Sequence, residues 1–442
     1  MVKRFLALAF VLLTAASAAP QEDWIRTGTG LGQEKVRLAA AEFQLAFGGT
    51  PQSDTLRKVF NDTLWNDLEN AGIFDMVSKS FYPLSQPARP TDVVLSAWRN
   101  PPPNAGMLAF GNLGVSQDQL VVKGWLYDVK NDASPQVLAK QYSEAATPEN
   151  ARRIAHRFAN EIIFRLGGGL PGIAESRIFF ISNRSGHKEV WVMDYDGAGQ
   201  RQLTRSGSIA LSPRVSPDGS RVIFTSFAGS GVELAMYSME LGRLVHFPRY
   251  GGTNASPAWS PDGTKLAFSS SMRGDPEIFV AEASGVAPKR LTAFKGPDVS
   301  PAWNPKGGGQ IAFVSGRTGL PQIYIMDADG ANVQRLTDGG YALSPSWSPN
   351  GQFLAFSWNR KYGPGAPGGQ DIYLMDVASR QWVQLTRAGN NDFPSWSPDG
   401  RHIVFQSSRR GGTQIWSMLA DGSQQRPLTT AGSNTQPNWS WK

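Results

Sequence analysis

The sequence predicts a small α+β domain followed by an all-β six-bladed propeller that its own C-terminal strand closes. The main observation is a phrase of the form P-x-W-S-P-D-G, which recurs with first residues Pro213, Pro257, Pro301, Pro345, Pro394 and Pro437. The intervals between these prolines are 44, 44, 44, 49 and 43 residues, a period typical of propeller blades. The chain also contains 47 Gly and 30 Pro, which suits a structure with many tight turns.

The N-terminus has the pattern of an export signal. Lys3 and Arg4 precede a run of nine apolar residues, and residues 16–18 read A-S-A, a small-residue cleavage site. We expect residues 1–18 to be a signal peptide that is cleaved after Ala18. Nine apolar residues are too few to cross a ~30 Å hydrocarbon core as a helix. The sequence therefore predicts an exported, soluble mature protein without direct membrane insertion.

Residues 19–34 form the next segment, which contains several Gly and shows no hydrophobic period. The pattern favours a flexible N-terminal arm. The alternative is a short segment that becomes ordered against a partner or against its own domain.

Residues 35–166 mix strand and helix patterns and predict an α/β domain. Strands are expected at 36–40, 73–77, 93–98 and 119–129, with 135–142 as the hairpin partner of the last one. One helix is expected to begin at Ser53 or Asp54 and to end at residues 70–72. A second helix begins after Thr147, has Pro148 in its first turn, and ends at residue 166. Residues 167–175, which open with three consecutive Gly, form the linker.

Residues 176–442 divide into units of four strands, and the outer strand ends in Leu-Thr in five units. There are six strands of each kind. The first unit, which opens at Arg177, lacks an inner strand, and the inner strand that contains Trp439 has no strand after it. We expect these two ends to pair, because pairing closes the ring and leaves no open sheet edge at the seam.

Two residues recur with the blades and have structural explanations. The Trp of the repeated phrase is expected to fill the space between neighbouring sheets. An Arg follows the second strand at Arg184, Arg273, Arg317, Arg360 and Arg409. These arginines could present positive charge to a ligand, but their periodicity favours bonds within their own blades.

The sequence contains no recognisable catalytic or metal-binding motif, so we predict no catalytic residue, metal or cofactor. There is no Cys, and the four His lie in dissimilar contexts. The formal charge of +7 falls to +5 without Lys3 and Arg4, and the basic residues are scattered, which argues against nucleic-acid binding. Partner binding is the function class that remains.

The loops that lead into the innermost strands should surround one mouth of the axial channel. These loops are polar and differ from blade to blade, which is typical of a partner-binding surface. Sequence variation without a functional role would give the same differences. The candidate contact residues are Arg249, Thr253, Asn254, Lys295, Asp298, Tyr341, Asn391, Asp392 and Asn434.

The chain resembles the TolB family of the Tol–Pal system. The resemblance rests on W-L-Y-D-V at 125–129, on R-R-I-A-H at 152–156, and on the order of signal peptide, α/β domain and propeller. It implies a non-enzymatic periplasmic adaptor that binds the lipoprotein Pal at the channel mouth, with other envelope lipoproteins as further partners. It also implies a role in outer-membrane invagination during cell division and in envelope integrity. The implied contacts for TolA lie in the N-terminal arm: Glu22, Asp23, Trp24, Ile25 and Arg26.

The alternative function is an exported propeller enzyme or ligand sensor, either lyase-like or associated with a peptidase. A lyase would need charged groups on the channel wall and a metal ion. A peptidase would need a Ser/His/Asp domain, for which the ring leaves no room in this sequence.

Overall fold

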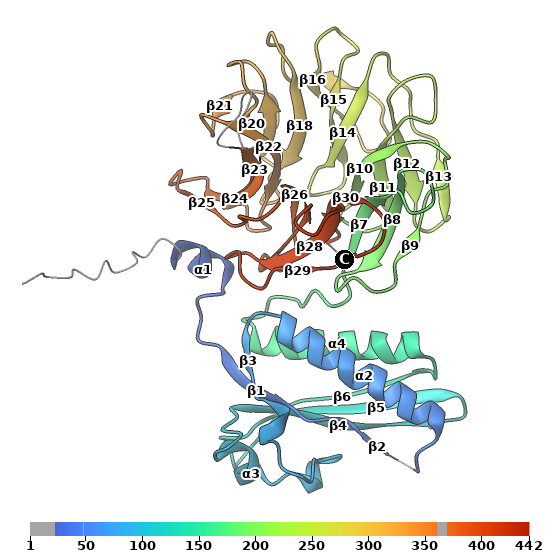
Figure 1. Cartoon of the computed structure of the whole chain (residues 1–442), viewed down its shortest axis with the longest axis vertical. Coiled ribbons are helices and arrows are strands. Elements are labelled where there is room, and N and C mark those ends of the chain that lie inside the picture. The colour runs from blue at the N-terminus through green and yellow to red at the C-terminus, as the bar shows by residue number, and fades with distance from the viewer. Residues whose placement is uncertain (1–22, 47, 360–368, 442) are drawn as a thin grey trace, which may run out of the picture.

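The structure is a computed structural model that describes residues 23–46, 48–359 and 369–441. A propeller of six four-stranded antiparallel sheets lies above a smaller N-terminal domain (Figure 1). The predicted six-bladed propeller is confirmed. Within the described residues, no helix is both long enough and apolar enough to cross a membrane.

The blades are numbered in chain order, and the strands of each run from the axis outward. Blade 1 contains β30 (Asn434–Trp439), β7 (Arg177–Ser182), β8 (Glu189–Asp194) and β9 (Arg201–Gln202). Blades 2 and 3 contain β10 (Ala210–Val215), β11 (Arg221–Ser226), β12 (Glu233–Ser238), β13 (Arg243–Val245), β14 (Asn254–Trp259), β15 (Lys265–Ser270), β16 (Glu277–Glu282) and β17 (Lys289–Arg290). Blades 4 to 6 contain β18 (Asp298–Trp303), β19 (Gln310–Ser315), β20 (Gln322–Asp327), β21 (Gln334–Arg335), β22 (Tyr341–Trp347), β23 (Phe353–Asn359), β24 (Asp371–Asp376), β25 (Trp382–Gln384), β26 (Asn391–Trp396), β27 (His402–Ser407), β28 (Gln414–Leu419) and β29 (Arg426–Pro427).

The ring is closed by the two ends of the propeller, as the strand count predicts. Strand β30 pairs antiparallel with β7, so that Trp439 lies opposite Ile178. The indole N–H of Trp439 donates to the Ser176 hydroxyl at 2.7 Å, and the Ser440 amide donates to the Arg177 carbonyl at 2.8 Å. Blade 1 therefore takes strands from both ends of this region and has no unpaired inner edge.

The repeated Trp residues fill the space between blades. Trp259, Trp347, Trp396 and Trp439 are buried. Three of their indole N–H groups donate at 3.1 Å to a backbone carbonyl of the preceding blade's inner strand: Trp259 to Arg214, Trp347 to Ala302, and Trp396 to Ser346. Each such Trp therefore packs against the preceding sheet and links two inner strands.

The recurring Leu-Thr ties down the outer edge of five of the six blades. In blade 4 the Thr337 hydroxyl donates to the Gln322 side chain at 2.8 Å and accepts from the Ile323 amide at 2.9 Å. The same pair of bonds recurs at Thr204, Thr292, Thr386 and Thr429. The motif therefore ties the end of the outer strand to the start of the third strand.

Three of the recurring arginines bond within their own part of the ring, as the sequence predicts. Arg184, Arg317 and Arg409 each donate to the Ser that ends the second strand and lie over aromatic rings of their blade. Arg273 is exposed, and Arg360 lies outside the described residues.

The N-terminal domain is one sheet with two helices on one face. Its strand order is β3-β1-β4-β5-β6, and β2 pairs with β4. The strands are β1 (Val36–Ala40), β2 (Gln44–Leu45), β3 (Phe74–Met76), β4 (Met107–Ser116), β5 (Gln119–Asp128) and β6 (Gln136–Ala145). Helices α2 (Pro51–Asn70) and α4 (Pro148–Leu166) pack on the sheet around a core that includes Phe60 and Phe158.

Three local predictions in this domain are wrong. Residues 93–98 do not form a strand: a turn of 3-10 helix, η2 (Pro90–Asp92), is followed by α3 (Leu95–Arg99), which packs Leu95 and buried Trp98 on the other face of the sheet. A second short turn, η1 (Lys79–Phe81), follows β3. Strand β4 has no counterpart among the predicted strands. Helix α2 begins earlier than expected, because Thr50 is its cap and its hydroxyl accepts from the Ser53 amide.

The N-terminal arm differs from the flexible segment that its sequence predicts. Residues Asp23–Thr29 form helix α1, which packs where blades 5 and 6 meet. Ile25 and Leu31 are buried against Phe353 and Leu419, and the Trp24 ring lies 5.5 Å from that of Phe353. The described part of the arm is therefore docked on the propeller by two buried apolar side chains.

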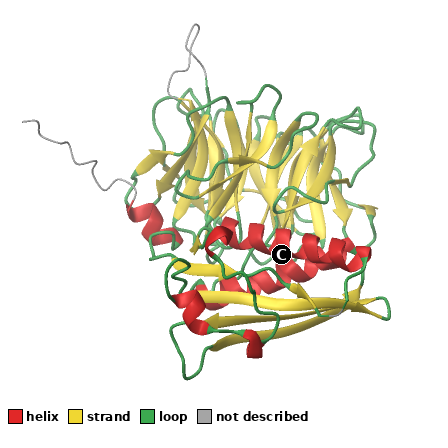
Figure 2. Ribbon diagram, turned by 60° about the horizontal axis from the view of Figure 1, so that its bottom comes forward, coloured by secondary structure: helices red, strands yellow, loops and turns green. Residues whose placement is uncertain are grey.

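The two domains meet through α2 and α4, which lie between the sheet and the propeller (Figure 2). The Tyr195 hydroxyl of the propeller donates to Asp67 of α2 at 2.6 Å, and His156 of α4 bonds the other carboxylate oxygen at 2.7 Å. Burial raises the pKa of Asp67, although the bonds from His156 and Tyr195 oppose this. Arg401 donates to the Gly167 carbonyl at 2.9 Å. The contacts on the propeller side come from turns on one face of the ring.

Candidate partner-binding site

The inner strands share a backbone irregularity that shapes the channel. One residue in each has a positive φ, between 50° and 54°, at Ser212, Ser256, Ser300, Ser344, Phe393 and Gln436. The pairing register with the second strand shifts at the same point in every blade, which identifies a β-bulge. The bulge bends each inner strand where it faces the axis. The six inner strands together enclose an axial cavity of about 240 Å³.

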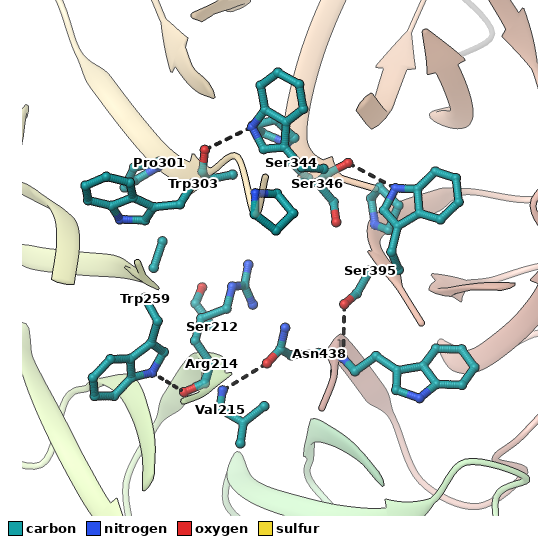
Figure 3. Close-up of a pocket in the computed structure, with 18 of the residues that line it drawn as sticks. Ser212, Arg214, Val215, Trp259, Pro301, Trp303, Ser344, Ser346, Ser395 and Asn438 are labelled. Carbon is teal, nitrogen blue, oxygen red and sulfur yellow. Dashed lines mark hydrogen bonds between the residues drawn. The ribbon is translucent and has the colours of Figure 1, made fainter. Parts of the chain in front are cut away.

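The cavity wall carries a single charged side chain among the described residues. Arg214 of β10 points into the cavity (Figure 3). The equivalent positions in the other blades are occupied by Ala258, Ala302, Ser346, Ser395 and Asn438. Burial lowers the pKa of Arg214 to about 10, so the group is still a cation at neutral pH. Sequence reasoning missed this residue, although the middle position of P-x-W offered the signal: only one copy has a charge there.

The predicted contact residues lie in or beside the segments that precede the inner strands, which we call the mouth loops. Because the strands of each blade are antiparallel, these loops lie on the face opposite the turns that hold Tyr195 and Arg401. The mouth loops therefore face away from the N-terminal domain. Arg249, Thr253 and Lys295 are exposed there, and Tyr341 is half-buried.

Four other predicted contact residues are buried and bond to side chains within the propeller. Asn254, Asp298, Asn391 and Asn434 all begin an inner strand and have no exposed surface. The Asn391 amide donates to Asp371 at 2.9 Å, and the Asn434 amide donates to Gln414 at 2.8 Å. Asn254 likewise donates to Glu233. The three Asn side chains therefore hold the mouth loops to the third strand of the preceding blade.

Asp298 and Asp392 are carboxylates whose surroundings differ from those of surface acids. Asp298 pairs with Arg317 at 2.8 Å, and burial raises the pKa of Asp298. Asp392 accepts from the Ser357 hydroxyl at 2.7 Å and from the Phe393 amide at 2.6 Å, and burial raises its pKa also. Both carboxylates therefore make their ion pair or hydrogen bonds with other residues of the propeller.

The predicted TolA contacts are only partly described. Glu22 lies outside the described residues. Trp24 and Ile25 face the propeller, and Arg26 is exposed with its Nε 3.8 Å from Asp421. Asp23 is the first residue of α1.

A family model described as the TolB beta propeller domain matches residues 165–363 and 339–442. The chain belongs to the TolB family. A relative named Tol-Pal system protein TolB from Desulfosudis oleivorans is 35% identical over 256 residues, which cover 57% of this chain and 56% of the relative. One of the same name from Cereibacter sphaeroides is 32% identical over 244 residues, covering 54% and 52%. The match thus spans about half the length of these TolB relatives.

A solved structure of TolB from Acinetobacter baumannii has the same fold. Its TM-score is 0.77 at 24% sequence identity, and the superposition covers 92% of this chain and 97% of that one. In the part of the chain that the structure describes, no three His, Asp or Glu side chains are grouped so that they could hold a metal ion.

Proposed function

We propose that this TolB-family chain is a non-enzymatic periplasmic adaptor of the Tol–Pal system. It binds the lipoprotein Pal at the mouth loops and TolA through the N-terminal arm, and it supports outer-membrane invagination during cell division and envelope integrity. The observation that carries the proposal is the mouth-loop face, which the N-terminal domain leaves open. No specific observation favours the alternative of an exported enzyme or ligand sensor.

The chemistry of the mouth loops supports a protein partner. Arg249 and Lys295 are exposed cations on loops that enter neighbouring blades. Phe294 and Ile209, which lie in the same set of loops, are 51% and 42% exposed. Cationic and apolar groups side by side fit a partner surface that offers carboxylates around apolar side chains.

The N-terminal arm supports a second partner that competes with the propeller. Ile25 is 1% exposed, so a partner that reads this side chain must first release α1 from blades 5 and 6. Burying one such side chain contributes about 1.5–3 kcal/mol. TolA capture therefore includes the cost of undocking, and anything that loosens α1 should strengthen it.

Charge reversal at the mouth loops tests the Pal proposal. We expect Arg249→Glu with Lys295→Glu to weaken binding of the soluble Pal domain by about tenfold or more in calorimetry, equivalent to about 1.4 kcal/mol. The matched control is Arg221→Glu with Lys265→Glu, two exposed cations that begin second strands on the opposite face. Equal weakening by both pairs, or by neither, would contradict the assignment of the face.

Deletion of residues 19–32 tests the division of labour between the arm and the ring. TolA capture in a pull-down should be abolished, while Pal binding should be retained. Loss of both partners would show that the arm does not act separately from the propeller.

A further inference from the structure

The axial cavity offers several hydrogen-bond donors, and no carboxylate lines its wall among the residues that the structure describes. All six inner strands contribute to the lining, mainly with Ser, Pro, Ala and Trp. Among the described residues that line it, Arg214 is the only one with a charged side chain. The cavity is therefore electropositive.

The guanidinium of Arg214 has unused donors. Its one hydrogen bond to a described residue runs from Nη1 to the neighbouring Pro213 carbonyl at 2.9 Å. It forms no ion pair with any described carboxylate, whereas Arg317 in blade 4 has its own Asp298. In Figure 3 the planar end of Arg214 lies in the open centre of the cavity.

Two further donors lie beside Arg214. Asn438 of β30 accepts from the Val215 amide through Oδ1 at 2.9 Å, which fixes the orientation of its side chain. Its NH₂ group is then turned toward the cavity, on the side where Arg214 lies (Figure 3). Ser212 contributes a hydroxyl from the bulge of the same strand as Arg214. The geometry thus gathers a cationic fork, an amide donor and a hydroxyl at one place.

We propose that the axial cavity binds one oxyanion, a carboxylate or a phosphate, against Arg214, Asn438 and Ser212. Guanidinium recognises both groups through paired, charge-assisted hydrogen bonds. An unpaired cation in a confined site is unfavourable, and a bound anion would remove that cost. Apolar filling of the channel would need no charge, as Ala258 and Ala302 illustrate at the equivalent positions.

The oxyanion could come from either of two sources. It could be a free small anion, or a carboxylate of a partner that reaches into the axial cavity. Both offer the same atoms to Arg214. The site itself does not depend on the identity of the partner proposed above.

Free anions are tested first, on the full chain. Wild type and Arg214→Gln are compared by thermal unfolding in sodium phosphate, sodium acetate and sodium chloride at equal ionic strength. We expect phosphate or acetate to raise the Tm of wild type by about 2 °C or more relative to chloride and to leave Arg214→Gln unchanged. Arg214→Lys, which keeps the charge without the fork, should respond weakly. Arg205→Gln, at an exposed Arg on the loop before the same strand, should respond like wild type.

A direct readout uses selenate, a tetrahedral oxyanion that scatters anomalously. We expect an anomalous peak within hydrogen-bond distance of the Arg214 guanidinium in crystals of wild type, and no peak there in Arg214→Gln.

The partner source is tested with the soluble Pal domain. If free anions have no effect but Arg214→Gln weakens Pal binding by tenfold or more, the oxyanion is a partner carboxylate. If wild type does not bind Pal, the proposed function is wrong. The free-anion measurements still show whether the axial cavity binds an oxyanion. No response to free anions together with unchanged Pal binding by Arg214→Gln would overturn the proposal.

Discussion

At the scale of single residues, the buried charge of Asp298 is compensated by one ion pair. Its carboxylate is fully buried, and its charged partner is Arg317 at 2.8 Å. Arg317 also lies over the rings of Phe313, Tyr324 and Phe294. The pair joins the start of β18 to the loop after β19, so removing one partner leaves a charge without compensation in the interior.

We expect Arg317→Met to lower the free energy of unfolding by about 3 kcal/mol, because it leaves Asp298 buried and unpaired. Adding Asp298→Asn should restore about 1–2 kcal/mol of the free energy of unfolding, since the second change removes the unpaired buried carboxylate. Urea unfolding measures both. Lys295→Met, on the same mouth loop but exposed, should change stability by less than about 0.5 kcal/mol. A loss at Lys295 as large as that at Arg317 would contradict the pairing.

The sequence alone could not show which polar loop residues are buried and bonded between blades. Asn254, Asn391 and Asn434 look like exposed loop residues because polar loop positions usually face water. Their partners are 20 or 21 residues away in the third strand of the preceding blade. Only the ring geometry brings these side chains together. Arg214 is the opposite case, since its deviation from the repeat is visible in the sequence but its position on the channel wall is not.

At the scale of elements, helix α1 is held by an unusually close approach. A Cβ added at Gly28 would overlap the ring of Phe353, and the Gly28 carbonyl accepts from Asn350 at 3.2 Å. The packing of the helix on Phe353 therefore depends on the absence of a side chain at this position.

Gly28→Ala should release α1 without altering any of the candidate TolA contacts. Alanine favours the helix itself, so the loss comes from docking and not from helix propensity. We expect faster proteolysis of the arm and TolA capture strengthened several-fold, with Pal binding by the ring retained. Gly48→Ala, where a Cβ would meet nothing within 4 Å, is the control. Unchanged proteolysis in Gly28→Ala would contradict the docked helix.

The contact between α4 and blade 1 includes an ion pair that we expect to weaken in acid. Arg152 of α4 pairs with Asp196 at 2.6 Å, in the turn after β8. Burial acts to raise the pKa of Asp196, but the bond and charge of Arg152 outweigh it and hold the pKa below 3.8. A lowered carboxylate pKa means that the pair contributes its full stability above pH 3.8 and loses it as the pH falls further.

Arg152→Gln should therefore lower the free energy of unfolding by about 1–2 kcal/mol at pH 7. The difference from wild type should persist down to about pH 4 and shrink at lower pH, where Asp196 becomes protonated. Urea unfolding as a function of pH measures it. A difference that grows as the pH falls would contradict the sign.

Helices and strands can be predicted from the sequence where apolar residues recur with a clear period. They are predicted poorly where tertiary packing determines the local structure. Helix α4 (Pro148–Leu166) and the blade strands follow from periodic apolar residues. Strand β4 contains Gly111, where a Cβ would meet the Lys123 carbonyl and the Phe43 ring, so a packing requirement weakens the strand pattern in its sequence. Just before α3 the β-branched Val93 and Val94 favour a strand, yet the segment forms a short helix that buries Trp98.

At the scale of the whole molecule, the propeller depends on its closure. Trp439 is 1% exposed and bonds Ser176, so its ring packs at the seam where the last inner strand meets β7. The closure could be predicted because splitting one blade between two ends explains the strand count. The orientation of the ring on the N-terminal domain could not, because it depends on single contacts such as Tyr195 with Asp67.

We expect Trp439→Ala to lower the free energy of unfolding by about 3–5 kcal/mol, because it empties a buried site at the seam. Trp441→Ala is the matched control, since Trp441 is 44% exposed two residues further on, and its effect should be below about 0.5 kcal/mol. Thermal or urea unfolding compares them. Equal effects would show that the seam does not hold the ring.

A partner is proposed to bind this ring on the face that the N-terminal domain leaves open. Hydrogen exchange of the full chain, with and without the soluble Pal domain, tests it most directly. Protection should appear in the mouth loops, around Arg249, Lys295 and Tyr341, and not in the turns that hold Tyr195 and Arg401. Protection confined to those turns, or none at saturating Pal, would contradict the claim.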